Sequence, residues 1–373
     1  MPVKARDLHS AEPNVDGIEP LEPASRRLAK TRQRMRRRRG SGDRELDERI
    51  RALVASMPVE NADLLEDVVE TAFRMAREAN RGEMKLVARS LRELGRAFRI
   101  FAPYRDRRKV SIFGSARTPE FHNEYIAARE FAQAMASRGW MVITGAGPGI
   151  MAAGHEGAGA ANSFGVGIKL PIEQSANEFI ARDPKLIDFK YFFTRKITFM
   201  KESDAFALLP GGFGTMDEAY ELLTLMQTGK TAIRPLVLIE PEGSTYWAEW
   251  LGFLQMHLVA SNLVSPEDMS FIKHAESIDD AIAEIEHFYA NYHSARYVGE
   301  RLIIRLQRKP THAQIERLNH EFADIIVTGR IRSIPPTGEE IRDRDALELA
   351  RIALQPTHNF ARLRELIDAL NDL

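Results

Sequence analysis

Short apolar runs alternate with helical segments through the middle of the chain, and this alternation limits its possible folds more than any other feature. The runs are KVSIF at 109–113, MVIT at 141–144, GVGIKL at 165–170, AFALL at 205–209 and PLVLIE at 235–240. Strands that are apolar throughout are typical of parallel sheets covered by helices on both faces. Residues 105–290 are therefore predicted to form an α/β domain with a doubly wound, Rossmann-like parallel sheet.

The segments on either side of this domain have different patterns. Residues 1–42 are expected to form a disordered basic tail, with several prolines and an arginine run from Arg26 to Arg39. That run is a solvated tail or the start of a helix, or else it contacts nucleic acid or an acidic partner. Residues 43–104 repeat apolar residues at three- and four-residue steps, which predicts a helical extension. Residues 291–373 are predicted to be a small α-rich C-terminal module in which RLIIRL at 301–306 could be a strand.

Composition excludes several kinds of site and partner. The 373 residues include no cysteine, so disulfides, cysteine-ligated zinc, iron–sulfur clusters and a thiol nucleophile are ruled out. The net charge of −1 gives no overall field that would favour nucleic acid or an anionic membrane. No apolar run approaches the roughly 18 residues of a membrane helix, and the first residues lack the apolar core of a signal peptide. We expect a soluble, cytoplasmic protein.

Two glycine-bearing turns follow the first two predicted strands, where a parallel sheet binds its ligands. In FGSART, Gly114 allows close approach to the backbone and Ser115 offers a hydroxyl, although a plain strand-to-helix turn has the same pattern. In TGAGPGIM, three glycines open a helix whose free N–H groups favour an anion. Their spacing differs from the dinucleotide fingerprint, which favours a nucleotide phosphate or ribose over a whole dinucleotide. Close helix–strand packing is the structural alternative.

A third turn, in LLPGGFGTMDEAYELL at 208–223, follows the strand at 205–209 and carries three glycines and Thr215 at a helix start. Backbone N–H groups and a hydroxyl in this arrangement predict an anion cradle. The glycines are not followed by Lys-Ser or Lys-Thr, so the turn is not a Walker A loop. Glu218, just beyond it, either stabilises the helix dipole or lies beside the sugar of a bound nucleotide.

Two adjacent cations, Arg195 and Lys196, precede this turn in the otherwise apolar segment YFFTRKITFM at 191–200. Helical neighbours point about 100° apart, so only one of the two is expected to face a ligand. The alternative is a pair of surface cations that extend along apolar surface into solvent.

These motifs resemble those of the LOG family, the cytokinin riboside 5′-monophosphate phosphoribohydrolases and related bacterial nucleoside monophosphate nucleosidases. PGGFGTMDE is similar to the family signature PGGxGTxxE, and FGSAR, GAGPGIM and the Arg195-Lys196 pair occur in the expected order. The resemblance covers about residues 105–290, and the flanking segments resemble those of longer bacterial members. Family members were long mislabelled as lysine decarboxylases.

The resemblance implies a Rossmann-like homodimer, or a larger homo-oligomer, that hydrolyses the N-glycosidic bond of nucleoside monophosphates to free base and ribose 5-phosphate. The family's catalytic residues correspond to Arg195 and Glu218. Phe193 and Thr194 stand where small members commonly have His-Glu, which leaves the base preference open. The predicted nucleotide and phosphate contacts are Gly114, Ser115, Gly145, Gly147, Gly149, Ile150, Met151, Lys196, Gly211, Gly212, Gly214 and Thr215.

The chemistry of these residue types agrees with that reaction. Glycosidic cleavage develops an oxocarbenium-like sugar, and a carboxylate such as Glu218 stabilises this positive charge and orients the attacking water as a base. A guanidinium is a poor proton donor, so Arg195 is not expected to act as an acid. Its expected role is to hold phosphate or to offset charge on the leaving base. No cofactor and no metal is expected.

Other functions are compatible with parts of the same pattern. A non-catalytic nucleotide or cofactor carrier would use the same scaffold and phosphate loops. A pyridoxal-phosphate lysine decarboxylase would need a Schiff-base lysine and an acid partner, and no segment identifies them. No membrane partner is expected, and nucleic acid is expected only through the run from Arg26 to Arg39.

Overall fold

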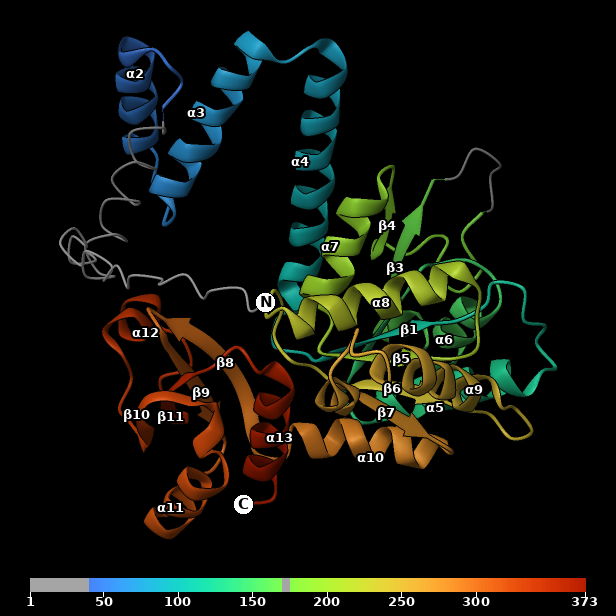
Figure 1. Cartoon of the computed structure of the whole chain (residues 1–373). Coiled ribbons are helices and arrows are strands. Elements are labelled where there is room, and N and C mark those ends of the chain that lie inside the picture. The colour runs from blue at the N-terminus through green and yellow to red at the C-terminus, as the bar shows by residue number, and fades with distance from the viewer. Residues whose placement is uncertain (1–39, 170–174) are drawn as a thin grey trace, which may run out of the picture. The chain divides into compact units, whose positions relative to one another are not determined.

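The computed structural model describes residues 40–169 and 175–373, and Figure 1 shows the path of the chain. The predicted basic tail lies almost entirely outside the described residues, including its arginine run. The chain divides into two compact units, Met1–Arg89 and Ser90–Leu373. The domain boundaries expected at 42, 104 and 290 stay a prediction.

The first unit consists of helices among its described residues. They are α2 (Arg44–Ala55), α3 (Ala62–Glu78) and the beginning of α4 (Arg81–Phe101). Asp43 caps α2, since its side chain accepts a hydrogen bond from the backbone N–H of Leu46 at 3.2 Å, and it forms an ion pair with Arg77 of α3. No helix in the described part of the chain is long and apolar enough to cross a bilayer.

A seven-stranded parallel sheet forms the centre of the second unit. Its strands are β1 (Lys109–Phe113), β2 (Met141–Thr144), β3 (Ser163–Ile168), β4 (Leu186–Phe189), β5 (Ala205–Leu208), β6 (Leu236–Ile239) and β7 (Ile272–Ala275). Their order is β4-β3-β2-β1-β5-β6-β7, and every neighbouring pair is parallel. The predicted doubly wound α/β fold is confirmed. The winding reverses between β1 and β5, which is where such sheets bind ligands.

Helices cover both faces of this sheet because its strands are apolar on both sides. Along β5, Ala205 and Ala207 belong to one buried cluster, whereas Phe206 and Leu208 belong to the other. The remaining elements of this region are η1 (Ala102–Tyr104), α5 (Asn123–Ser137), α6 (Ile150–Ala158), η2 (Ala160–Asn162), α7 (Phe192–Glu202), α8 (Phe213–Gln227), α9 (Tyr246–Phe253), the π-helical turn η3 (Leu254–Val259), η4 (Pro266–Phe271) and α10 (Ile278–Phe288).

The C-terminal module contains a four-stranded antiparallel sheet and is therefore richer in strand than its α-rich prediction. It comprises β8 (Tyr292–Val298), β9 (Arg301–Leu306), α11 (His312–Glu321), η5 (Ala323–Ile325), β10 (Ile326–Ser333), α12 (Gly338–Asp343), β11 (Ala350–Pro356) and α13 (Phe360–Asn371), with strand order β10-β11-β9-β8. The expected strand at 301–306 is present. ALELARIAL at 346–354, part of the module predicted to be α-rich, supplies most of β11, because pairing with β9 outweighs its helical propensity. The sequences of β8 and β10 carry charged residues and lack a continuous apolar run.

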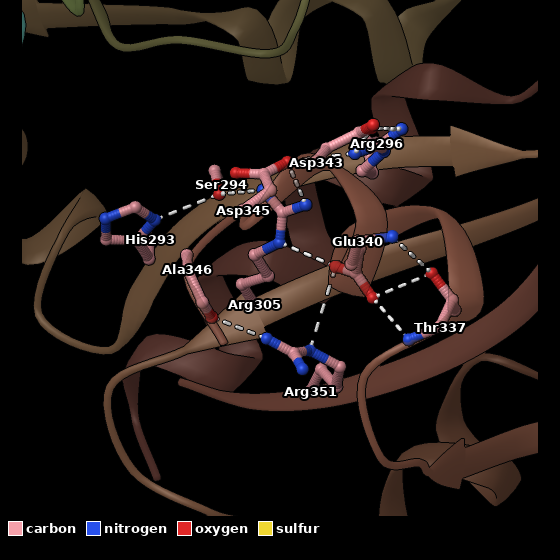
Figure 2. A network of polar contacts seen from close by, with 10 residues as sticks. All are labelled: His293, Ser294, Arg296, Arg305, Thr337, Glu340, Asp343, Asp345, Ala346 and Arg351. Carbon is pink, nitrogen blue, oxygen red and sulfur yellow. Dashed lines mark hydrogen bonds and ion pairs between the residues drawn. The ribbon is translucent and has the colours of Figure 1, made fainter. Parts of the chain in front are cut away.

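A buried network of charges holds α12 against the strands of this module (Figure 2). Glu340 of α12 is fully buried, and its Oε1 accepts a hydrogen bond from Arg305 Nε at 2.8 Å. Its Oε2 accepts hydrogen bonds from the backbone N–H and the hydroxyl of Thr337, at 2.9 and 3.0 Å. Arg351 Nε lies 3.7 Å from the same carboxylate. Both carboxylate oxygens therefore have partners.

Candidate active site

A cavity of about 760 Å³ opens at the carboxyl ends of the central strands. It extends from the turn after β5, past the ends of β1, β2 and β3, to the end of β4. Nine of the predicted site residues line it together with both predicted catalytic residues. They are Gly114, Ser115, Gly145, Gly147, Met151, Gly211, Gly212, Gly214 and Thr215, with Arg195 and Glu218. Segments far apart in the sequence thus meet at the predicted edge of the sheet.

The turn from Gly211 to Thr215 forms one end of the cavity. A Cβ at Gly211 would lie 2.1 Å from Thr215 Oγ1 and 3.1 Å from the backbone of Gly114, so only glycine fits where the turns after β1 and β5 meet. Gly212 and Gly214, in contrast, border open space, since a Cβ at either position would have no atom within 4 Å. Because α8 begins at Phe213, its first N–H groups lie at this end, as an anion site requires.

The turn after β2 is held by a chain of hydrogen bonds that ends on a buried imidazole. Asn177 donates its backbone N–H to the carbonyl of Ala146 and its amide Nδ2 to the carbonyl of Gly147, both at 2.9 Å. His155 Nε2 lies 3.0 Å from the carbonyl of Phe164, to which it must donate. Burial lowers the pKa of His155 and favours the neutral ring, so its Nδ1 accepts from Asn177 Nδ2 at 3.1 Å.

Arg195 and Lys196 point in different directions, as their adjacent positions on α7 require. Arg195 lines the cavity, and its Nε donates a hydrogen bond to the carbonyl of Val166 at 2.8 Å. Its Nη2 would lie 2.5 Å from a Cβ at Gly145, so this glycine makes room for the guanidinium. Lys196 does not line the cavity and instead forms ion pairs with Asp217, at 2.8 Å, and Glu221.

Glu218 places a buried carboxylate on the cavity wall. The residue is only 5% exposed, and its Oε2 has no hydrogen-bond partner among the described residues. Lys196 Nζ lies 4.0 Å away. Burial raises the pKa of Glu218 to about 7, although the charges of Lys196 and Arg195 oppose this shift. A carboxyl with this pKa can accept and release a proton near neutral pH.

Three further predicted residues lie outside the cavity wall. Gly149 and Ile150 do not line it, and neither does Lys196. Gly149 has a φ of 64°, and a Cβ there would lie 2.4 Å from the carbonyl of Ser115. Ile150 is fully buried and would contact a Cβ at Gly114 at 2.7 Å. Gly149 and Ile150 therefore pack against the turn after β1 without facing the cavity.

Several residues of the cavity were not singled out from the sequence. Arg117 lines the cavity beside Ser115, Tyr246 donates its hydroxyl hydrogen to the carbonyl of Gly211, and Asp188 and Phe192 lie at the far end by β4. Two local features of the sequence could have identified Arg117 and Asp188: an arginine directly after the FGSA turn, and a carboxylate inside the apolar strand LIDF. Within the described residues, no group of three or more His, Asp or Glu side chains is arranged to hold a metal ion.

Thr194, one of the two positions that depart from small LOG members, is turned away from the cavity. It is fully buried, and its hydroxyl donates a hydrogen bond to Glu93 of α4 at 2.7 Å. The other oxygen of Glu93 accepts from the backbone N–H of Lys190 at 2.9 Å. Phe193, the second such position, is 45% exposed. The threonine at this position is therefore explained by its hydrogen bond to Glu93, in the helix that precedes the sheet.

Comparison with known proteins identifies relatives of this region. Residues 151–285 match the family model described as "Possible lysine decarboxylase". A cytokinin riboside 5′-monophosphate phosphoribohydrolase of Mycobacterium tuberculosis is 32% identical over 158 residues, which cover 42% of this chain and 81% of that protein. An enzyme of the same name from Arabidopsis thaliana is 34% identical over 94 residues, covering 25% of this chain and 42% of the plant protein.

Among solved structures, the molybdenum cofactor carrier protein of Chlamydomonas reinhardtii matches 48% of this chain and 96% of its own, with 22% identity and a TM-score of 0.34. The sequence relationship to the mycobacterial protein is much more informative, because it combines 32% identity with most of that protein's length. The chain belongs to the LOG family of cytokinin riboside 5′-monophosphate phosphoribohydrolases.

Proposed function

We propose that the protein hydrolyses the N-glycosidic bond of nucleoside 5′-monophosphates, such as AMP or cytokinin riboside monophosphates, to free base and ribose 5-phosphate. The observation that carries this proposal is the buried Glu218 carboxylate, whose Oε2 lacks a partner among the described residues and whose pKa is raised to about 7. It lies in one cavity with an anion cradle and Arg195.

The phosphate is assigned to the end of the cavity by β1 and β5. Free N–H groups at the start of α8, the hydroxyls of Ser115 and Thr215, and the guanidinium of Arg117 lie at this end. Backbone N–H groups, hydroxyls and a cation are the usual ligands of a phosphate group. The 5′-phosphate therefore fixes the nucleotide with its ribose toward Glu218.

Cleavage then needs a negative charge beside the ribose and a base for water. As the bond between C1′ and the base nitrogen breaks, its electron pair leaves with the base and C1′ becomes positive. The Glu218 carboxylate stabilises this charge and takes a proton from the water whose oxygen attacks C1′. The departing base gains a proton from solvent, and Arg195 stabilises developing negative charge while remaining charged itself.

The test is incubation with a panel of purine and pyrimidine nucleoside monophosphates, followed by chromatography for free bases. Glu218→Gln is expected to lower turnover at least about a hundredfold, the scale of a lost acid–base group. Glu221→Gln is the matched control, because Glu221 lies on the same helix and pairs with the same lysine but does not line the cavity. Near-normal base release by Glu218→Gln would contradict the proposal. Tight nucleotide binding without base release in the unaltered protein would favour a non-catalytic carrier.

Self-association is a further part of this proposal. Large apolar side chains remain exposed on α7 outside the cavity wall, namely Phe193 and Ile197, which are 45% and 46% exposed. Residues four apart on a helix are neighbours, and neighbouring exposed apolar side chains are typical of protein interfaces. We propose at least a homodimer, for which light scattering of the purified protein should give twice the chain mass or more. A cytoplasmic location stays a prediction.

A further inference from the structure

The two ends of the cavity offer opposite chemistry to a ligand. The end by β1 and β5 presents hydroxyls, free N–H groups and Arg117, whereas the end by β4 presents Asp188 and Phe192. These ends are three to four strand spacings apart in the order β4-β3-β2-β1-β5, or about 14 to 19 Å at 4.8 Å per spacing. Arg195 lies between them, since it bonds Val166 of β3 and lies beside Gly145 in the turn after β2.

Asp188 is available to a ligand. Its neighbours on β4, Ile187 and Phe189, are buried in the core, so the alternation of the strand directs Asp188 to the other side. Its carboxylate makes no hydrogen bond or ion pair with the residues that the structure describes. Gly167 pairs with it on β3, and a Cβ at Gly167 would lie 3.1 Å from Asp188 Oδ1. The absent side chain keeps the space beside the carboxylate open.

We propose that Asp188 is the residue that selects the base, by accepting a hydrogen bond from an exocyclic amino group. This inference rests on the proposed hydrolysis of nucleoside monophosphates. With the phosphate at the β1–β5 end and the glycosidic bond at Glu218, the base extends toward β4. An ionised carboxylate only accepts hydrogen bonds, so it pairs with the amino group of adenine or cytosine and repels the oxo group at the same position of hypoxanthine or uracil.

Phe192 completes this subsite from the start of α7. Its ring lines the same end of the cavity and is 53% exposed, so it presents an apolar face to a planar base. Stacking on an aromatic side chain favours every base to a similar extent. Discrimination among bases is therefore assigned to Asp188, and Phe192 contributes affinity.

The experiment compares two pairs of substrates that differ only in an amino or oxo group, AMP with IMP and CMP with UMP. For the unaltered protein, kcat/KM for the amino member is expected to exceed that for the oxo member by at least about tenfold, as for a hydrogen bond to a charged group. Asp188→Asn should bring each ratio to within about threefold, because an amide both donates and accepts. Glu178→Gln removes the same charge from an exposed residue that does not line the cavity, and it should leave both ratios unchanged.

Binding provides a second readout that is independent of base release. The Kd values of AMP and IMP are measured by calorimetry in a Glu218→Gln background, with and without Asp188→Asn. The same preference, and its loss on Asp188→Asn, is expected. Ratios near one in the protein with Asp188, or ratios that Asp188→Asn leaves unchanged, would overturn the assignment. Absence of base release alongside an Asp188-dependent binding preference would refute hydrolysis but support the subsite.

Discussion

Glu218 at the cavity and Glu340 in the C-terminal module are both buried carboxylates with two cations nearby, yet their surroundings differ. Every oxygen of Glu340 has a partner, from Thr337, Arg305 and Arg351 (Figure 2). Burial alone would raise the pKa of Glu340, but these hydrogen bonds and charges lower it below its ordinary value. Oε2 of Glu218 has no hydrogen-bond partner among the described residues, and burial raises its pKa to about 7.

The difference separates a carboxylate with a structural role from one that we propose to be reactive. A fully paired buried charge stabilises the arrangement around it and has little capacity left for a ligand. An incompletely paired one costs free energy in the folded protein and retains capacity for a proton or a developing positive charge. The partners of a buried carboxylate, rather than its burial alone, thus indicate its role.

The largest expected effect that tests this comparison is on stability. Glu340→Gln leaves Arg305 and Arg351 buried without their shared negative charge, and it should lower the free energy of unfolding by about 3 to 5 kcal/mol. Glu218→Gln should leave stability at pH 8 unchanged or higher, because a neutral amide is less costly to bury than a carboxylate whose pKa is raised. Urea denaturation of both variants measures this. A larger loss for Glu218→Gln than for Glu340→Gln would break the comparison.

The next effect is on the pH dependence of activity. If Glu218 acts ionised with a pKa of about 7, kcat/KM should fall about tenfold per unit as the pH drops below 7. Between about pH 4.5 and 7 the folded state holds a proton that the unfolded chain has released, so the Glu218 contribution to stability decreases as the pH rises. Glu340, with its lowered pKa, stays ionised throughout this range.

The measurement is kcat/KM from pH 5 to 9, with the residual activity of Glu218→Gln as the control. That residual activity should lack the inflection near pH 7. A profile of the unaltered protein that is level from pH 5 to 8 would contradict the role of Glu218.

The smallest effect concerns a paired polar group that holds a cavity-lining turn. Asn177→Ala removes the side-chain bond to Gly147 and the partner of His155, and the loosened turn should raise KM about two- to tenfold with kcat nearly unchanged. Asn162→Ala is the matched control, since Asn162 bonds Arg107 and Ala158, neither of which lines the cavity. A fall in kcat comparable to that of Glu218→Gln would show that paired groups here also take part in the chemistry.

Five of the seven parallel strands and the glycine turns were predictable because their signals are local, whereas β4 and β7 were not predicted. Apolar runs such as 109–113 identify strands by themselves, and the glycines of PGGFG mark a turn within a few residues. Arg195 and Glu218 were identified as candidates by the family motif, and the structure places both on one cavity. Their roles remain our proposal.

The remaining features depend on contacts that a linear pattern does not show. Asp188 and Arg117 belong to one cavity only because β4 and β1 end at the same edge of the sheet. Lys196 points away from the cavity because of its position on α7 and because of the carboxylates of α8 that it meets. In the C-terminal module, β11 is a strand because β9 and β10 pair with it on either side.

The bonds of Glu93 to Thr194 and Lys190 have a practical consequence for anyone who shortens this protein. A version trimmed to residues 105–290, the extent of the family resemblance, would lose Glu93 and with it the acceptor for the Thr194 hydroxyl and the Lys190 amide. Arg195 follows Thr194 directly on α7, so this loss would reach the cavity. A shortened version that keeps these contacts must therefore begin before the first strand, within α4.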